Sequence, residues 1–354
     1  MQLNKEQELL KEMLEIYSPS LREEKLADFL LKKMKKLGFS AHKDEVGNPV
    51  GILGSGEKEI LLVGHIDTVE GEIPVRVENE NLFGRGSVDA KAPMACYISA
   101  VARFAGKKLD GWKIIIVGAV CEEIAGKDNS KGARNLLGKY SPNYILIGEP
   151  SSWDAITLGY KGALRVLFSL EQEKFHGAHK GLNALEKSVQ FYNSVREFAE
   201  TFNQGKQGFE QLEMRLEKIE NNSTEFVEKI VLKLRFRLPV DFNSKDLKNF
   251  LESIKDSGKI DFADEDPAIR VPKSGKLVSA FIKAIRSEKG EPRFKSKSGT
   301  SDMNVLGPHY KCQILAFGPG DSALDHTPNE HISLKEFDKS VNVLEKVLQE
   351  LLKS

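Results

Sequence analysis

The chain has 354 residues, of which 40% are hydrophobic and 29% charged, and its formal net charge is zero. This composition is typical of a soluble globular protein, and the neutral balance argues against general binding to nucleic acid or an anionic membrane. An apolar run of about eighteen residues that could span a bilayer is absent, as is the apolar core of a signal peptide. Three widely separated cysteines are typical of reduced thiols, so we expect a cytoplasmic protein.

Two pairs of residues near the start have the spacing of a helix capping box. Asn4 with Gln7, and Ser20 with Glu23, each precede apolar residues at helical intervals. Both pairs therefore predict the beginning of a helix.

The rest of the first half alternates buried strands with helices. Strands are expected at 60–63, 113–120 and 144–147, and helical patterns at 89–104 and 130–137. This alternation predicts an α/β domain with a mostly parallel sheet between helices.

The pattern changes near residue 160. Longer strands interrupted by charges are expected at 163–170 and 226–238, with a strand at 260–263 and helices at 182–202 and 247–254. This β-α-β-β-α-β-like order predicts an α+β, ferredoxin-like domain at 160–270, inserted into a domain formed by 1–159 and 271–354. A helix from Lys276, a strand at 312–317 and a final helix from Ser333 resume the α/β pattern.

Acidic residues and a histidine gather where the predicted strands end. Such positions are held by His65, Asp67, Asp89, Glu122, Glu123 and Glu149, and His326 follows the last apolar strand. Ligands bind at this edge of open α/β sheets, and so many carboxylates would repel one another without cations. Histidine with carboxylates suits zinc or a similar divalent ion, and a shared Asp suits two ions.

Two points stay open on the residues alone. His65 and Asp67 could instead form a polar pair that only completes the strand end, without a metal. Of the adjacent Glu122 and Glu123, one is expected to bind an ion and the other to transfer protons.

The motifs HID, GRGSVDAK, CEE, GEP and DHTPNE, in this order, resemble the M20 family of dinuclear zinc amidohydrolases and peptidases. The resemblance covers nearly the whole chain and implies two divalent ions, zinc or alternatively cobalt. It implies that His65 and Glu149 hold one ion, that Glu123 and His326 hold the other, and that Asp89 bridges them. It further implies that Asp67 orients His65 and that Glu122 is the general base.

Within the family, GRGSVDAKAP, GEPSSWDAITLGYKGALRV and KSGTSDMNVL are most similar to hydrolases that release lysine or ornithine from an acidic amino-group carrier protein. Those enzymes act in lysine and arginine biosynthesis. The alternatives are an N-acetyl-lysine or N-acetylornithine deacetylase and a succinyl-diaminopimelate desuccinylase. A general dipeptidase or carboxypeptidase, a related peptidase without the inserted domain and a non-catalytic relative are further alternatives.

Several substrate contacts are also predicted, each with a structural alternative. Tyr160 and Lys161 could contact substrate or form a hinge; Gly299, Thr300 and Ser301 could contact substrate or cap a helix. Arg237 could bind a substrate carboxylate or be a solvated strand residue. A basic docking rim for the carrier is expected from Arg293, Lys295, Lys297, Lys161, Arg165, Lys174 and Lys180.

The resemblance also implies a homodimer formed through the inserted lid domain. In the family, a lid histidine reaches the active site of the partner subunit, within an AHSxxP-like stretch. Here the stretch is FHGAHK, without the proline, so His176 is expected to act and His179 is the alternative.

Overall fold

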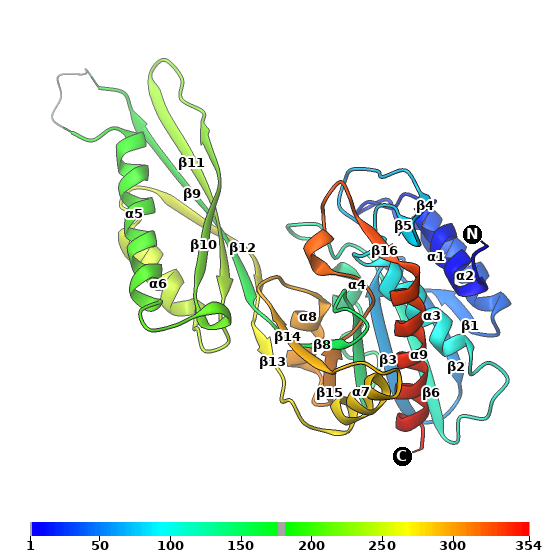
Figure 1. Cartoon of the computed structure of the whole chain (residues 1–354). Coiled ribbons are helices and arrows are strands. Elements are labelled where there is room, and N and C mark those ends of the chain that lie inside the picture. Colours follow the sequence, from blue (N-terminus) through cyan, green and yellow to red (C-terminus); the bar gives the residue numbers. More distant parts are fainter. Residues whose placement is uncertain (1, 176–180, 354) are drawn as a thin grey trace. The chain divides into compact units, whose positions relative to one another are not determined.

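The computed structural model describes residues 2–175 and 181–353 (Figure 1). The chain forms two compact units. The first unit contains Met1–Gly159, Arg270–Ser296 and Ser301–Ser354, and the second contains Tyr160–Ile269 and Lys297–Thr300. The short segment Lys297–Thr300 lies with the second unit because the Lys161 N–H donates to the Lys297 carbonyl (3.0 Å). Among the described residues, no helix is long and apolar enough to cross a membrane.

A mixed sheet forms the centre of the first unit. Its strand order is β1 (Ser40–Lys43), β2 (Pro49–Gly54), β6 (Trp112–Ala119), β3 (Lys58–His65), β7 (Tyr144–Gly148), β15 (Gln313–Ala316), β8 (Ala155–Tyr160) and β13 (Ile269–Arg270), while β14 (Arg293–Lys297) pairs with β8. The central strands β6, β3, β7 and β15 are parallel to one another, whereas the pairs β1–β2, β2–β6 and β15–β8 are antiparallel. The predicted α/β class with a mostly parallel sheet is confirmed.

The register of the central strands brings their carboxyl ends to one edge. His65 lies opposite Ala119, and Gly64 lies opposite both Gly118 and Gly148. The residues that directly follow β6 and β7 therefore leave the sheet beside His65.

Five helices share one apolar core with this sheet: α1 (Lys5–Leu14), α2 (Glu24–Lys36), α3 (Lys91–Ala102), α7 (Lys276–Ser287) and α9 (Leu334–Leu351). Alternate strand residues such as Ile60, Leu62 and Ile114 point into this core, as the two-residue period of a strand requires. The short helices α4 (Lys131–Arg134) and α8 (Asp302–His309) pack against β6 and β15 outside this cluster.

The two capping predictions have different outcomes. Asn4 and Gln7 form the expected capping box at the start of α1. The prediction for Ser20 and Glu23 is wrong, because Glu23 itself occupies the N-cap of α2 and makes no side-chain cap bond. The Ser20 hydroxyl instead donates to Asp67 (2.6 Å), and Glu23 accepts from the Cys121 N–H (3.0 Å). Ser20 and Glu23 have the spacing that is typical of a helix start, but here they bond to distant segments of the chain.

A small sheet connects two other loops of the first unit. Its order is β16 (His331–Ser333), β5 (Asn81–Phe83) and β4 (Arg76–Glu78), all antiparallel. In it, His331 lies opposite Phe83, so the segment after His326 runs beside the segment that leads to Asp89.

The second unit is an α+β sandwich. Its elements are β9 (Gly162–Glu173), α5 (Ala184–Phe202), β10 (Glu213–Asn221), β11 (Val227–Leu238), α6 (Ser244–Ile254) and β12 (Lys259–Asp266). The strands form an antiparallel sheet in the order β10-β11-β9-β12, which is the ferredoxin-like arrangement. Both helices pack on one face of this sheet through a separate apolar core.

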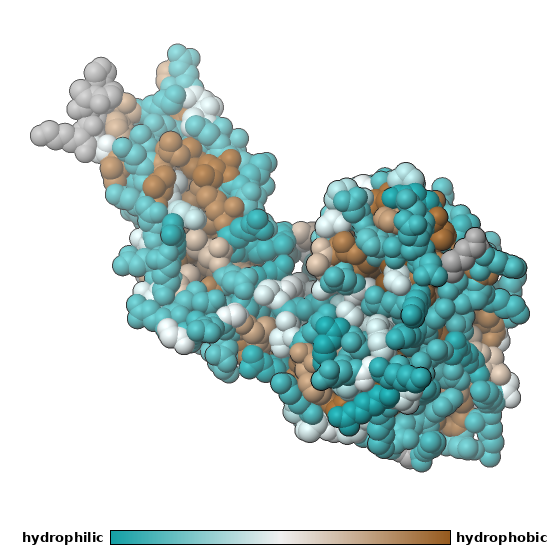
Figure 2. Space-filling model, viewed as in Figure 1, coloured by the Kyte–Doolittle hydropathy of each residue, from teal (hydrophilic) through white to brown (hydrophobic). Residues whose placement is uncertain are grey.

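Hydrophobic side chains are also exposed on this unit. Figure 2 shows them gathered on its visible face, and most of the exposed large hydrophobic side chains of the described residues belong to it: Phe175, Leu182, Leu185, Val189, Ile219, Phe226 and Val240.

Candidate metal centre

His65 is the last residue of β3 and is held in one ring orientation. Its Nδ1 donates to the main-chain carbonyl of Asp67 (3.0 Å), while the Asp67 carboxylate is farther away at 3.5 Å. A carbonyl can only accept, so the hydrogen of the neutral ring stays on Nδ1. The lone pair of Nε2 then points toward Asp89 Oδ1, 3.1 Å away. This is the tautomer that a metal-binding histidine needs.

Asp89 lies between two histidines. Its Oδ1 faces His65, and its Oδ2 lies 3.2 Å from Nε2 of His326. The residue precedes α3, and its peptide bond to Ala90 is cis. A carboxylate whose two oxygens face different imidazoles has the form required of a bridging metal ligand.

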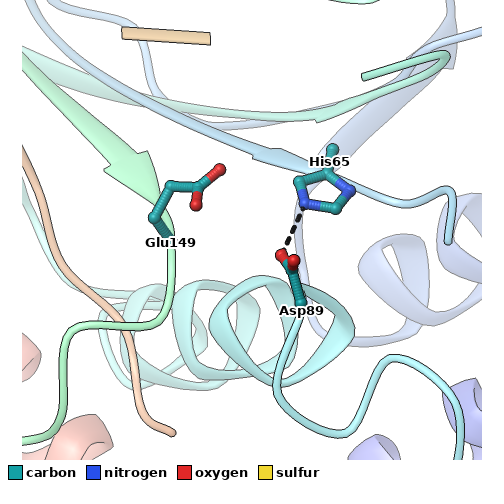
Figure 3. A group of neighbouring side chains, drawn as sticks. All are labelled: His65, Asp89 and Glu149. Carbon is teal, nitrogen blue, oxygen red and sulfur yellow. Dashed lines mark hydrogen bonds and ion pairs between the residues drawn. The ribbon is translucent and has the colours of Figure 1, made fainter. Parts of the chain in front are cut away.

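Among the described residues, the candidate ligand atoms form three groups, and within each group all atoms lie within 4.8 Å of one another. Figure 3 shows the first group, in which Glu149 and His65 flank Asp89. The groups are His65–Asp89–Glu149, Asp89–Glu123–His326 and His65–Glu122–Glu123. The first two groups have only Asp89 in common.

Burial and charge shift the pKa values of these groups strongly. Burial raises the pKa of Glu122 well above its usual range, and burial together with the charge of Asp89 raises that of Glu123. Burial would also raise the pKa of Asp89, but the neighbouring imidazoles of His326 and His65 lower it. Hydrogen bonds to Asp89 and Glu123 raise the pKa of His326 to about 10. Without a cation, protons must therefore neutralise this cluster.

The donor set fits divalent cations. Four carboxylates and two imidazoles supply only oxygen and nitrogen donors, which suits zinc and other first-row ions. Two divalent ions would also balance the four negative charges of Asp89, Glu122, Glu123 and Glu149.

The Asp67 carboxylate performs a task that the sequence did not indicate. It accepts from the N–H groups of Glu122 (3.1 Å) and Glu123 (3.0 Å) and from the Ser20 hydroxyl. Burial opposes its ionisation, but the neighbouring His65 imidazole keeps the pKa of Asp67 below the usual value. Asp67 thus holds the loop that carries both glutamates, and Ser20 is a positioning residue that sequence reasoning missed.

Another missed pair is Glu330 with Arg85, both buried. Their side chains meet at 2.8 Å between the loop of Asp89 and the loop of His326. The only signal for Glu330 was its place in the motif DHTPNE, four residues after His326.

The predicted substrate contacts lie in or beside the second unit. Tyr160 and Lys161 are buried there, and the Lys161 ammonium bonds to the Gln211 carbonyl and to Glu213. Arg237 donates to the Thr300 hydroxyl (3.3 Å) within the same unit.

The remaining predicted contacts are divided between the units. Gly299 and Thr300 belong to the second unit, whereas Ser301 caps α8 in the first. His176 and His179 lie outside the described residues. The proposed contacts with substrate stay predictions.

Three of the basic residues expected to form the docking rim make contacts within the chain. Lys161 is fully buried, Arg293 is paired with Asp154, and Arg165 contacts Asp264 (2.7 Å) and Glu217 (3.5 Å). Acidic neighbours within the same unit pair with these three residues. Local sequence did not reveal those neighbours, which come from other strands and loops. Lys180 lies outside the described residues, and the docking rim stays a prediction.

Comparison with known proteins agrees with this geometry. Residues 61–350 match the model of peptidase family M20/M25/M40. The chain belongs to this family. The M20 metallo-carboxypeptidase Sso-CP2 from Sulfolobus solfataricus shares the fold, with a TM-score of 0.78 and 17% identity over 99% of this chain and 100% of that one.

More similar family members are known by sequence. A [LysW]-lysine hydrolase from Deinococcus radiodurans is 38% identical over 98% of this chain and 96% of its own length. A putative [LysW]-lysine/[LysW]-ornithine hydrolase from Pyrococcus abyssi is 40% identical over 97% of this chain and 93% of its own length. Both similarities extend across the two units.

Proposed function

We propose that this M20 family member is a metal-dependent amide hydrolase that releases lysine, ornithine or both from the γ-glutamyl terminus of an amino-group carrier protein. The chemistry rests on one observation: two ligand groups meet at a single shared carboxylate, Asp89. The substrate rests on the names of the full-length relatives, which are [LysW]-lysine and [LysW]-lysine/[LysW]-ornithine hydrolases. A role in lysine or arginine biosynthesis is proposed together with this substrate.

The residues divide naturally between two ions. His65 and Glu149 would hold one, Glu123 and His326 the other, and Asp89 would contact both; the first two ligand groups support this division. The donor set favours Zn²⁺, with Co²⁺ as the alternative. When bound, such ions polarise an amide carbonyl and lower the pKa of water.

Glu122 is the proposed general base. It would take a proton from the water that attacks the amide carbon and give that proton to the nitrogen as the C–N bond breaks. The products are then the carrier's glutamyl carboxylate and a free amino acid. A carboxylate with a raised pKa suits both transfers, and Asp67 keeps Glu122 in place through its N–H.

The second unit is the proposed lid and dimerisation domain. Its exposed apolar side chains are of the kind that a partner subunit would cover. His176 would then assist the reaction in the partner's site, with His179 as the alternative, by donating to the developing oxyanion. A cytoplasmic location is also proposed, supported by three cysteines that form no disulfide.

A small-acyl deacetylase remains the second candidate, with N-acetyl-lysine or N-acetylornithine as substrate. The observation in its favour is that three of the basic residues expected to dock a protein carrier, Arg293, Arg165 and Lys161, are paired with acidic side chains or buried.

The function is tested by following free lysine and ornithine after the purified protein is mixed with carrier conjugates. The proposal predicts release by the metal-loaded wild type and no release by chelator-treated protein, with recovery on adding Zn²⁺ or Co²⁺. The Glu122→Gln variant is the matched control for contaminating hydrolases. Release that survives chelation would contradict the proposal.

A further inference from the structure

A buried carboxylate lies directly behind the shared ligand Asp89. Glu330 is only 1% exposed, and its Oε1 accepts from the N–H groups of Gly86 (3.0 Å), Val88 (2.8 Å) and Asp89 (3.1 Å). One carboxylate oxygen thus accepts three main-chain hydrogen bonds from the turn that ends at Asp89. The direction in which Asp89 projects is therefore coupled to the position of Glu330.

Glu330 also belongs to the loop that carries His326. Its carbonyl accepts from the Gly84 N–H (3.4 Å), and the next residue, His331, pairs with Phe83 in the small sheet. The loops of Asp89 and His326 are therefore joined by both main chain and side chain at this point.

Arg85 completes the link as the partner of the second carboxylate oxygen. Its Nη1 donates to Glu330 Oε2 (2.8 Å) and to the Thr327 carbonyl (3.3 Å), and its Nε donates to the Gly71 carbonyl (2.9 Å). Arg85 also neutralises Glu330, so the carboxylate adds no net charge beside an already acidic cluster.

A neutral side chain at position 330 could not make these contacts equally well. Three convergent N–H dipoles stabilise a negative acceptor more strongly than a neutral one, and charge-assisted bonds are shorter and stronger. Removal of the charge would leave the Arg85 guanidinium buried without its counter-charge, which is costly. The turn and the His326 loop would then be free to separate.

We infer that Glu330, with Arg85, is a positioning residue that sets the affinity of the centre for its metal ions. It acts by fixing Asp89 relative to His326 and contacts no reacting atom. The inference rests on the proposed function, in which Asp89 and His326 are metal ligands. Residues behind first ligands are known to change metal affinity by about 10- to 100-fold.

The test measures Zn²⁺ and Co²⁺ binding to chelator-treated full-length protein by calorimetric titration and competition with a chromophoric chelator. Glu330→Gln keeps the size of the side chain and an acceptor oxygen but removes the charge. We expect its metal affinity to fall by about 10- to 100-fold, while kcat at saturating metal stays within a few-fold of wild type. Glu330→Asp keeps the charge, but its shorter side chain moves the oxygens away from the turn, so it should also weaken metal binding.

Glu59→Gln is the matched control. Glu59 is a buried carboxylate of the same unit that accepts from the Ser141 N–H (2.7 Å) and pairs with Lys113 (2.8 Å). It lies near the start of β3, whereas His65 ends that strand. Its replacement should lower the unfolding temperature but leave metal affinity unchanged.

Wild-type metal affinity in Glu330→Gln, or an equal loss in Glu59→Gln, would overturn the inference. If Glu330→Gln does not fold, Glu330→Asp decides by the same titration, and wild-type affinity there would overturn it. Failure of the wild type itself to bind two ions would instead contradict the proposed function.

Discussion

Asp89 Oδ2 lies 3.2 Å from Nε2 of His326, although the second unit separates the two residues in the sequence. The other oxygen of Asp89 faces His65. Removal of this shared carboxylate should therefore affect both ion sites at once. We expect Asp89→Ala to bind at most one ion per chain, measured by metal analysis after dialysis. Occupancy by two ions would contradict the bridging role.

The Glu122→Gln variant should show whether Glu122 is the general base or a metal ligand. The substitution keeps size and hydrogen bonding but removes the base, so turnover should fall by about 10²–10⁴-fold with metal content unchanged. Metal analysis and lysine release from the same preparation provide the test. The group His65–Glu122–Glu123 allows the other result: loss of an ion together with activity would make Glu122 a ligand.

Ser20→Ala should weaken the loop that carries the two glutamates. The Ser20 hydroxyl donates to the buried Asp67 carboxylate at 2.6 Å, and a bond to a charged group contributes about 1.5–3 kcal/mol. We expect lower kcat at saturating metal and a lower unfolding temperature. Ser18→Ala is the control, because that hydroxyl donates to the Ile66 carbonyl (2.8 Å) and not to Asp67. Equal losses of kcat in both variants would show that the hydrogen bond to Asp67 contributes no more to turnover than the hydrogen bond to the Ile66 carbonyl.

The metal-free protein should show a pH dependence that comes from His326. Its pKa is about 10 in the folded chain, against 6.5 as its ordinary value. Between these values the folded state binds more protons than the unfolded state, so this stabilisation is present below pH 6.5 and is lost as pH rises toward 10. Lys91 acts in the opposite direction, since burial lowers its pKa to about 7.

Comparison with His326→Gln isolates this contribution. The difference in unfolding temperature between chelator-treated wild type and the variant should narrow as the pH rises from about 7 to 9. Metal affinity of the wild type should rise over the same range, because protons compete with the ions for the same ligands. A constant or widening difference in unfolding temperature would contradict the assigned pairing.

The lid proposal predicts complementation between two inactive variants. His176→Ala supplies an intact base, and Glu122→Gln supplies an intact lid histidine. Mixed under conditions of subunit exchange, they should recover part of the activity, whereas either alone should not. The same experiment with His179→Ala identifies which histidine acts. Recovery in neither mixture would leave no support for a lid histidine acting across subunits.

The sequence was sufficient for the parts that depend on local pattern. Short apolar runs ending in acidic residues placed His65, Glu122 and Glu149 at one sheet edge, because parallel strands share a carboxyl end. The elements of the second unit other than β10 could be read in the same way from their periodicity.

Long-range contacts could not be predicted from the sequence. The spacing of Ser20 and Glu23 fits a helix cap equally well, and nothing nearby indicates that their partners are Asp67 and Cys121. Lys161 looked like a surface lysine because Glu213, which pairs with it, belongs to β10, a strand whose charged sequence gave no clear signal.

The central claim is that the substrate is an aminoacyl carrier protein and not a small N-acyl amino acid. The most direct measurement is kcat/KM of the metal-loaded protein for the carrier conjugates of lysine and ornithine, beside N-acetyl-lysine and N-acetylornithine under identical conditions. The account predicts that at least one conjugate is preferred by a factor of about 10² or more, which corresponds to about 2.7 kcal/mol of transition-state stabilisation. An equal or higher kcat/KM for an N-acetyl amino acid would contradict it and would identify the protein as a deacetylase.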